Sequence, residues 1–287
     1  MYRRVGVATT FSPRFAAVLA EAGLVSRSLS APLCLIHADV FAHEKEERFR
    51  SALRDLQLDD RSEIRFESGQ PAEAILKAQH EASIDLLVAG AMETESVHRN
   101  FTGDVARELL RRAHCDLLLY TEPRENPKPP EGILVAIPDF SELSRQVLRS
   151  ALNFAERSGG RHVTILYVQT TFAEAKEKAL GVSNGALPAE ETLEAWVREE
   201  ERPPLELDYH LLRGNTGFTA CEFIQSSGAD LVVMPSQMPS AFQPVFAPAL
   251  DWIIQVIPAN LWVIRQTPKK LACIEHKCLR ICDRCRL

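Results

Sequence analysis

The stretch Ser83–Val88 reads Ser-Ile-Asp-Leu-Leu-Val, and Gly228–Val233 reads Gly-Ala-Asp-Leu-Val-Val. In both, an aspartate stands directly before a run of branched apolar residues, and the two stretches lie 145 residues apart. A short apolar run of this kind is typical of a strand that is buried on both faces of a parallel sheet. Its recurrence at long range indicates an internal repeat, and therefore two copies of one domain.

The repeat extends outward from these two strands. Phe11–Ser12 recurs as Phe140–Ser141, at a smaller offset of 129 residues. The difference between the two offsets requires a net insertion of about sixteen residues, which we place between residues 169 and 204 of the second copy. A chain of 287 residues also exceeds the length at which one core stops growing, so two domains are expected.

Apolar strands alternate with amphipathic helical segments in the first copy. Ser12 and Pro13 predict the N-cap and first position of the helix that follows the first strand. The strands expected in this copy are Val5–Thr9, Leu33–Ala38, Ile64–Glu67, Leu86–Ala89 and Leu117–Tyr120. Alternation of strands and helices predicts the α/β class, with two tandem five-stranded parallel sheets that carry helices on both faces.

The composition sets the domain limits and the broad class of the protein. We expect domains at residues 1–122 and 131–267, a proline-rich linker at 123–130 and a Cys-rich basic tail at 268–287. The net charge of -6 gives no bulk attraction to nucleic acid or to an anionic membrane. The chain has neither a signal-peptide pattern nor an apolar run of about 20 residues, so a cytoplasmic protein is expected. In that compartment the three scattered cysteines are expected to be reduced core thiols: Cys34, Cys115 and Cys221.

Several segments together resemble the universal stress protein family. They are a strand followed by Phe11–Ser12, Gly69 followed after one residue by Pro-Ala-Glu-Ala-Ile-Leu, the Asp85–Gly90 strand and the final Ala113–Tyr120 segment. The resemblance covers about residues 3–122 and again 131–267. It implies a five-stranded parallel sheet with four helices per domain. In nucleotide-binding members it also implies a G-x2-G-x9-G-[ST] loop for phosphates and an acidic residue for the ribose at the end of the first strand.

The first copy keeps the register of that loop but changes its chemistry. Gly90 and Gly103 stand at the first and third glycine positions, whereas Glu93 replaces the second glycine and Asp104 replaces the hydroxyl residue. Thr10 stands where the family has its acidic residue. Because a carboxylate at a helix start can itself occupy the anion position, the nucleotide site is expected to be degenerate. Weak ATP binding with slow hydrolysis through the two glycines is the alternative.

The second copy lacks all three glycines of the loop. Prolines at 235, 239, 244 and 248 remove backbone donors, and the loop around residues 237–249 is apolar. It either packs against the other domain or lines a hydrophobic ligand cavity. Asp139 aligns with the acidic ribose position of the family, but an aspartate before Phe-Ser is more typical of a helix start, and that interpretation is favoured.

The C-terminal tail gathers five side chains that can bind a metal ion. They are Cys273, His276, Cys278, Cys282 and Cys285. Thiolates suit zinc or an iron–sulfur cluster, and the basic residues around them lower thiol pKa values. A redox-reactive thiol tail and a disordered tail without a specific role are the alternatives.

No pattern of a hydrolase, metalloprotease or P-loop enzyme is present in the sequence. We therefore expect a stress-response protein that binds or signals and is not a conventional enzyme. Its partner would be a small-molecule ligand or another protein, and its two copies would pack as a pseudo-dimer, with a further homodimer as an open possibility. An ATP-binding protein and a metal or redox sensor are the alternative functions.

Overall fold

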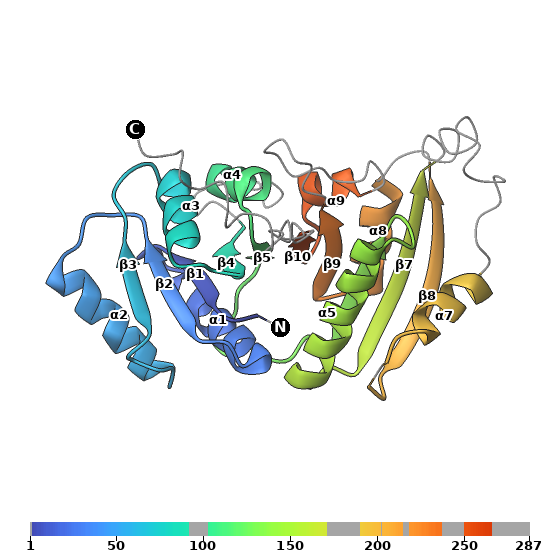
Figure 1. The fold of residues 1–287 in the computed structure, drawn as a ribbon, viewed down its shortest axis with the longest axis horizontal. Helices are drawn as coiled ribbons and strands as arrows, with labels where there is room; N and C mark the ends of the chain where they lie inside the picture. Colours follow the sequence, from blue (N-terminus) through green and yellow to red (C-terminus); the bar gives the residue numbers. More distant parts are fainter. Residues whose placement is uncertain are drawn as a thin grey trace, which may run out of the picture.

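The computed structural model describes residues 2–91, 103–170, 190–201, 203–214, 218–236 and 250–265. Strands and helices alternate along both halves of the chain (Figure 1). The first half comprises β1 (Val5–Thr9), α1 (Phe15–Leu29), β2 (Leu33–His37), α2 (His43–Asp55), β3 (Glu63–Phe66), α3 (Pro71–Glu81), β4 (Leu86–Gly90), α4 (Asp104–Arg112) and β5 (Asp116–Tyr120). The second half comprises β6 (Gly132–Ile137), α5 (Glu142–Ser158), β7 (His162–Thr170), α7 (Glu190–Arg198), β8 (Glu206–Gly214), α8 (Phe218–Ser227), β9 (Leu231–Ser236), α9 (Asp251–Val256) and β10 (Asn260–Arg265).

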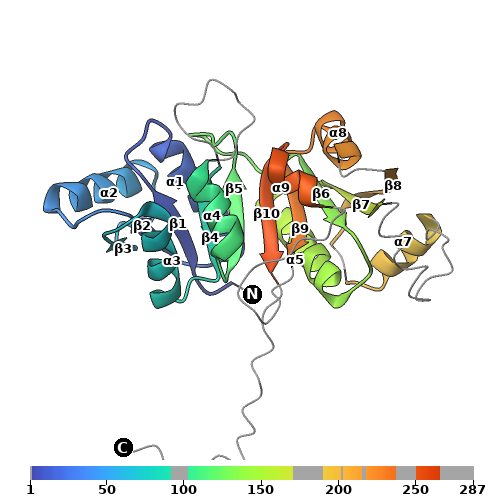
Figure 2. The same ribbon diagram turned by 90° about the horizontal axis from the view of Figure 1, so that it is seen from above.

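The strands form one ten-stranded sheet in the order β3-β2-β1-β4-β5-β10-β9-β6-β7-β8. Within each half the strands are parallel and follow the same order, so the α/β fold of two five-stranded repeats is confirmed. The two halves meet where β5 and β10 pair antiparallel, with Leu118 opposite Trp262. These two strands lie side by side in the middle of the molecule (Figure 2). The sequence did not predict this pairing.

Helices cover both faces of the sheet and enclose two cores. One core lies under α1, α2, α5 and α7, and the other lies under α3, α4, α8 and α9. Within β4, Leu86 and Val88 belong to the first core, whereas Leu87 and Ala89 belong to the second. Because alternate side chains point to opposite faces and both faces are covered, the strand reads as a continuous apolar run.

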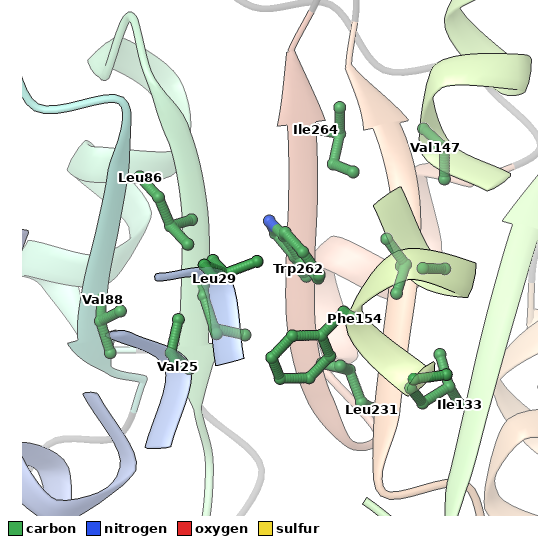
Figure 3. Packing of buried hydrophobic residues seen from close by; sticks show 14 of the residues in the cluster. Val25, Leu29, Leu86, Val88, Ile133, Val147, Phe154, Leu231, Trp262 and Ile264 are labelled. Carbon is green, nitrogen blue, oxygen red and sulfur yellow. The ribbon is translucent and has the colours of Figure 1, made fainter. Parts of the chain in front are cut away.

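The first core continues across the junction between the two repeats. Phe154 of α5 packs edge-on against Trp262 of β10, with ring centroids 5.3 Å apart. Leu29 of α1 approaches Trp262 from the first repeat (Figure 3). The two repeats therefore share apolar packing as well as strand pairing.

The first helix begins later than the sequence pattern predicted. Phe15 donates its backbone N–H to the carbonyl of Ser12 at 3.0 Å, and Arg14 is the N-cap of α1. A turn therefore replaces the first helical residues, and Ser12, Pro13 and Arg14 form a loop at the carboxyl end of β1. No helix in the described part of the chain has both the length and the hydropathy that crossing a membrane requires.

Candidate functional site

The topological switch point of the first repeat lies between β1 and β4. These strands are parallel neighbours, with Val5 opposite Leu86 and Val7 opposite Val88. The chain leaves β1 for α1 in one layer, whereas the helix that follows β4 is α4, in the other layer. In open α/β sheets such divergence leaves a crevice at the carboxyl ends of the strands, where ligands bind.

A pocket of about 270 Å³ occupies this crevice. Its described lining comes from the ends of β1, β2, β4 and β5 and from the N-terminal parts of α1, α3 and α4. The lining residues are Ala8, Thr9, Thr10, Ser12, Arg14, Phe15, Val18, Ala38, Pro71, Ile75, Ala89, Gly90, Ala91, Gly103, Val105, Ala106, Leu109, Tyr120 and Pro123. Most of these side chains are apolar, so the pocket favours a ligand with an apolar body.

Three of the residues that the sequence singled out meet in this pocket. Thr10, Gly90 and Gly103 all line it, although they are far apart in the sequence. Gly103 is the N-cap of α4, and its N–H donates to the Ala91 carbonyl at 2.9 Å. A β-carbon at Gly90 would meet the nearest atom, Val18 Cγ2, at 3.7 Å, which is ordinary contact. The protein around Gly90 therefore does not itself require a glycine there.

Asp104 lies beside the pocket but does not line it. It is the first residue of α4, its side chain is 90% exposed, and its Oδ1 lies 3.9 Å from Nη1 of Arg107. The N–H groups of the first helical turn lack intrahelical acceptors and attract anions. A carboxylate in that turn disfavours a second negative charge from a ligand. Glu93 lies outside the described residues.

Arg14 is a pocket residue that the sequence reasoning missed. Its side chain is exposed at the mouth of the pocket, and Nη1 donates to the carbonyl of Thr121 at 3.2 Å. The available signal was its position: it follows the first strand by a few residues, and the carboxyl ends of parallel strands share one edge of the sheet. The helical prediction that began at Ser12 placed it inside a helix and concealed this role.

The inner wall of the pocket is tied to the linker between the repeats. Tyr120 is buried and hydrogen-bonded to Glu21 of α1, and burial together with that carboxylate raises the Tyr120 pKa well above its usual value. Glu21 also accepts the backbone N–H of Arg124 at 3.1 Å. Burial raises the pKa of the Glu21 carboxyl. Buried Glu21 thus connects the pocket wall to the linker through hydrogen bonds to Tyr120 and Arg124.

The corresponding acidic residue of the second repeat takes part in starting a helix. Asp139 Oδ1 accepts the backbone N–H of Ser141 at 3.0 Å and the hydroxyl of Ser144 at 2.7 Å. Ser141 is the N-cap of α5 and accepts the backbone N–H of Ser144. These contacts are those of a helix-start residue. The apolar loop at residues 237–249 lies outside the described residues.

The cysteines divide into two groups. Cys34, Cys115 and Cys221 are free and buried, as expected for core thiols, and burial raises their pKa values to about 11, 12 and 11. The proposed metal ligands of the tail lie outside the described residues, so that site stays a prediction. Among the described residues, no cluster of three or more His, Cys, Asp or Glu side chains could hold a metal ion.

The repeated fold agrees with a comparison against known families. The sequence model of the universal stress protein family matches residues 38–121 and again residues 131–265. The chain belongs to the universal stress protein family. One match falls on each repeat, so this is a tandem member of the family.

Solved structures show the same tandem arrangement. A functionally unknown protein from Pseudomonas aeruginosa PAO1 is similar over 93% of each chain, with a TM-score of 0.69 and 12% identity. A universal stress protein from Archaeoglobus fulgidus DSM 4304 has a TM-score of 0.61 and 16% identity, over 91% of this chain and 98% of its own. At these identities the likeness concerns the fold alone. A search of curated proteins found no match.

Proposed function

We propose that this universal stress protein acts in the stress response as a ligand-binding or signalling protein without turnover of its own. Its ligand site is the pocket of the first repeat. The observation that carries the proposal is a pocket of about 270 Å³ at the switch point of the sheet, lined by the ends of β1, β2, β4 and β5 and by the starts of α1, α3 and α4. That is the position at which open α/β sheets bind small molecules.

The chemistry of the lining supports binding over catalysis. Among the described lining residues the side chains are apolar or carry hydroxyls, apart from the guanidinium of Arg14. General acid–base catalysis uses groups such as His, Asp, Glu, Lys or Tyr in contact with the substrate. Tyr120 is the one residue of these types among the described lining, and burial raises its pKa well above the usual value, which opposes proton release near neutral pH.

A nucleotide is the second candidate ligand, because Gly90 and Gly103 line the same pocket at the positions of the family's phosphate loop. Thr10 could hydrogen-bond a ribose hydroxyl in place of a carboxylate. The carboxylate of Asp104 in the first turn of α4 opposes a triphosphate there. We therefore rank an adenine nucleotide below a ligand with less negative charge.

Native mass spectrometry and thermal unfolding of the purified full chain test the general proposal. A bound small molecule should appear as added mass. Ala106 is buried in the pocket lining on α4, so the larger side chain of Ala106→Leu should fill part of the pocket and abolish the added mass. The proposal of a ligand site in this pocket is contradicted if the protein carries no added mass and if adenosine, AMP, Mg-ATP and octanoate all leave its thermal unfolding midpoint unchanged.

Mg-ATP is tested separately. At 100 times its Kd it should add about 2.7 kcal/mol to the free energy of unfolding. Gly103→Val is the test variant. It should fold as the wild type does, because Gly103 has φ -60° and ψ 151°, a backbone conformation that valine adopts without strain. A stabilisation by Mg-ATP that this variant abolishes would favour the nucleotide, whereas no stabilisation would retire it.

A further inference from the structure

We infer that the ligand of the first-repeat pocket is amphipathic, with an apolar body inside the pocket and an anionic group bound by Arg14. This inference rests on the proposed ligand-binding function and names the class of molecule that the site takes. It places the negative charge at Arg14 and not at the first turn of α4, where the family's phosphate loop leads.

The interior of the pocket suits a small apolar body. Phe15 and Val18 of α1 line one side, and Ile75 of α3 and Leu109 of α4 line the other. Removing such side chains and a ligand chain from water together is favourable in proportion to the apolar area buried. At about 270 Å³ the pocket lies just below the roughly 300 Å³ at which ordinary small-molecule sites begin, so the apolar part is short.

Arg14 provides the positive charge for the polar end of the ligand. It is the only charged side chain among the described residues that line the pocket. Its hydrogen bond to the Thr121 carbonyl uses a single donor of the five that a guanidinium carries. No carboxylate of the described residues lies within ion-pair distance of it, whereas Arg124 nearby lies 3.3 Å from Asp230. Arg14 can therefore bind a carboxylate or phosphate oxygen directly.

The start of α4 is the competing place for an anion. Asp104 lies in that turn with its side chain 90% exposed, so a ligand anion there would meet a carboxylate of the protein. Like charges at short range oppose each other, and the cation of Arg107, 3.9 Å from Asp104, offsets part of this repulsion. The same ligand avoids this repulsion when its anion turns toward Arg14.

A second hollow receives the charged end of the ligand. A polar cleft of about 570 Å³ adjoins the pocket and shares Arg14 and Pro123 with it. Its other described charged lining residues are Glu122, Arg124 and Asp230, and the Asp230 carboxylate lies 3.3 Å from Arg124. Its far wall belongs to the second repeat, where Asn260 accepts the backbone N–H of Thr121 at 3.0 Å. An anion at Arg14 thus keeps part of its hydration in the cleft and lies where the two repeats meet. The arrangement separates an apolar compartment from a polar one, as an amphipathic ligand requires.

Isothermal titration calorimetry of the full chain with octanoate, octanol and octylammonium tests the inference. The three probes share one alkyl chain and differ in charge. Wild-type protein should bind octanoate most tightly, and Arg14→Gln should weaken octanoate by roughly 10- to 100-fold, the range of a charge-assisted hydrogen bond, while leaving octanol unchanged. Arg27→Gln, which removes an exposed arginine from the last turn of the same helix, should bind octanoate as the wild type does. Ala106→Leu should weaken all three probes.

Each other outcome overturns a defined part of the inference. Equal affinities for octanoate and octanol, or an Arg14→Gln variant that keeps full octanoate affinity, would refute the anion site and leave the apolar pocket standing. If wild-type protein that is folded, as judged by cooperative unfolding, binds none of the three probes, the amphipathic class of ligand is wrong. Whether the pocket binds any other ligand is then decided separately, by native mass spectrometry and by thermal unfolding with adenosine, AMP and Mg-ATP.

Discussion

The contacts of Arg265 at the end of β10 predict that the second repeat stabilises the first. Its side chain is 2% exposed, and its Nε donates to the carbonyl of Cys115 at 2.9 Å. Nη2 donates to the carbonyls of Leu110 at 2.9 Å and Leu109 at 3.4 Å, in the last turn of α4. A cation at a helix C-terminus satisfies unpaired carbonyls and interacts favourably with the helix dipole. Replacing Arg265 with Met should therefore loosen α4, although α4 belongs to the other repeat.

The expected loss is about 3–5 kcal/mol of the free energy of unfolding. Methionine keeps an apolar stem but leaves the carbonyls of Cys115 and Leu110 buried without this donor, at about 1–3 kcal/mol each. Removal of one partner from a buried charged network costs a similar total of about 3–5 kcal/mol. The backbone N–H of Arg265 still donates to Asp116 in the variant. Burial lowers the Arg265 pKa to about 10, so its charge is already costly in the wild type, and the lower end of the range is expected.

Urea unfolding of the full chain measures the loss, and hydrogen exchange locates it. The amides of α4 should lose protection in Arg265→Met, whereas those of α2 should change less. Arg27→Met is the matched control, because Arg27 is exposed and its replacement should stay within about 0.5 kcal/mol of the wild type. A loss below about 1 kcal/mol in Arg265→Met, or unchanged exchange in α4, would refute the role of Arg265 as the cap of α4.

Three further predictions concern individual polar side chains. Burial raises the Asp116 pKa to about 6, so between about pH 4 and 6 the native state keeps a proton that the unfolded chain has released. The free energy of unfolding of the wild type should therefore fall as the pH rises through this window. Urea unfolding of Asp116→Asn should show a free energy that depends less on pH in the same window. The three core thiols, Cys34, Cys115 and Cys221, should resist iodoacetamide at pH 8 in the native protein and react in urea, as peptide mass spectrometry can measure. Asp139→Ala should cost about 0.5–2 kcal/mol in urea unfolding, because the start of α5 loses two hydrogen bonds; no loss would show that water replaces them.

The strands could be predicted closely because their pattern is local. Leu86–Ala89 was expected as a strand and is β4 with Gly90 added, and Val5–Thr9 is β1 without change. A run of branched apolar residues suits a strand that two layers of helices cover, wherever the strand lies in the sheet. Helix starts were less certain, since Ser12 and Pro13 fit both an N-cap and a turn.

The candidate site was only half visible in the sequence. Gly90 and Gly103 could be found because the family's loop is a motif with fixed spacing, and Thr10 because it follows the first strand. Arg14 also follows the first strand, but the helix expected from Ser12 onward concealed it. Tyr120 could not be found in that way, because the wall of a pocket is assembled from several elements that approach only after folding. Whether an arginine faces a pocket or a neighbouring carboxylate depends on those approaches.

The sequence by itself determined the repeat, the order of the strands along the chain and the family, because each depends on patterns within short segments and on their recurrence. The tertiary structure alone decided that β5 and β10 pair antiparallel and that Arg265 of one repeat ends a helix of the other. The backbone groups of an apolar edge strand can pair with any strand of suitable shape, so the residues of the edge strand do not determine which strand pairs with it. The choice is made by the whole surface that the two repeats bury together, which no single segment of the sequence contains.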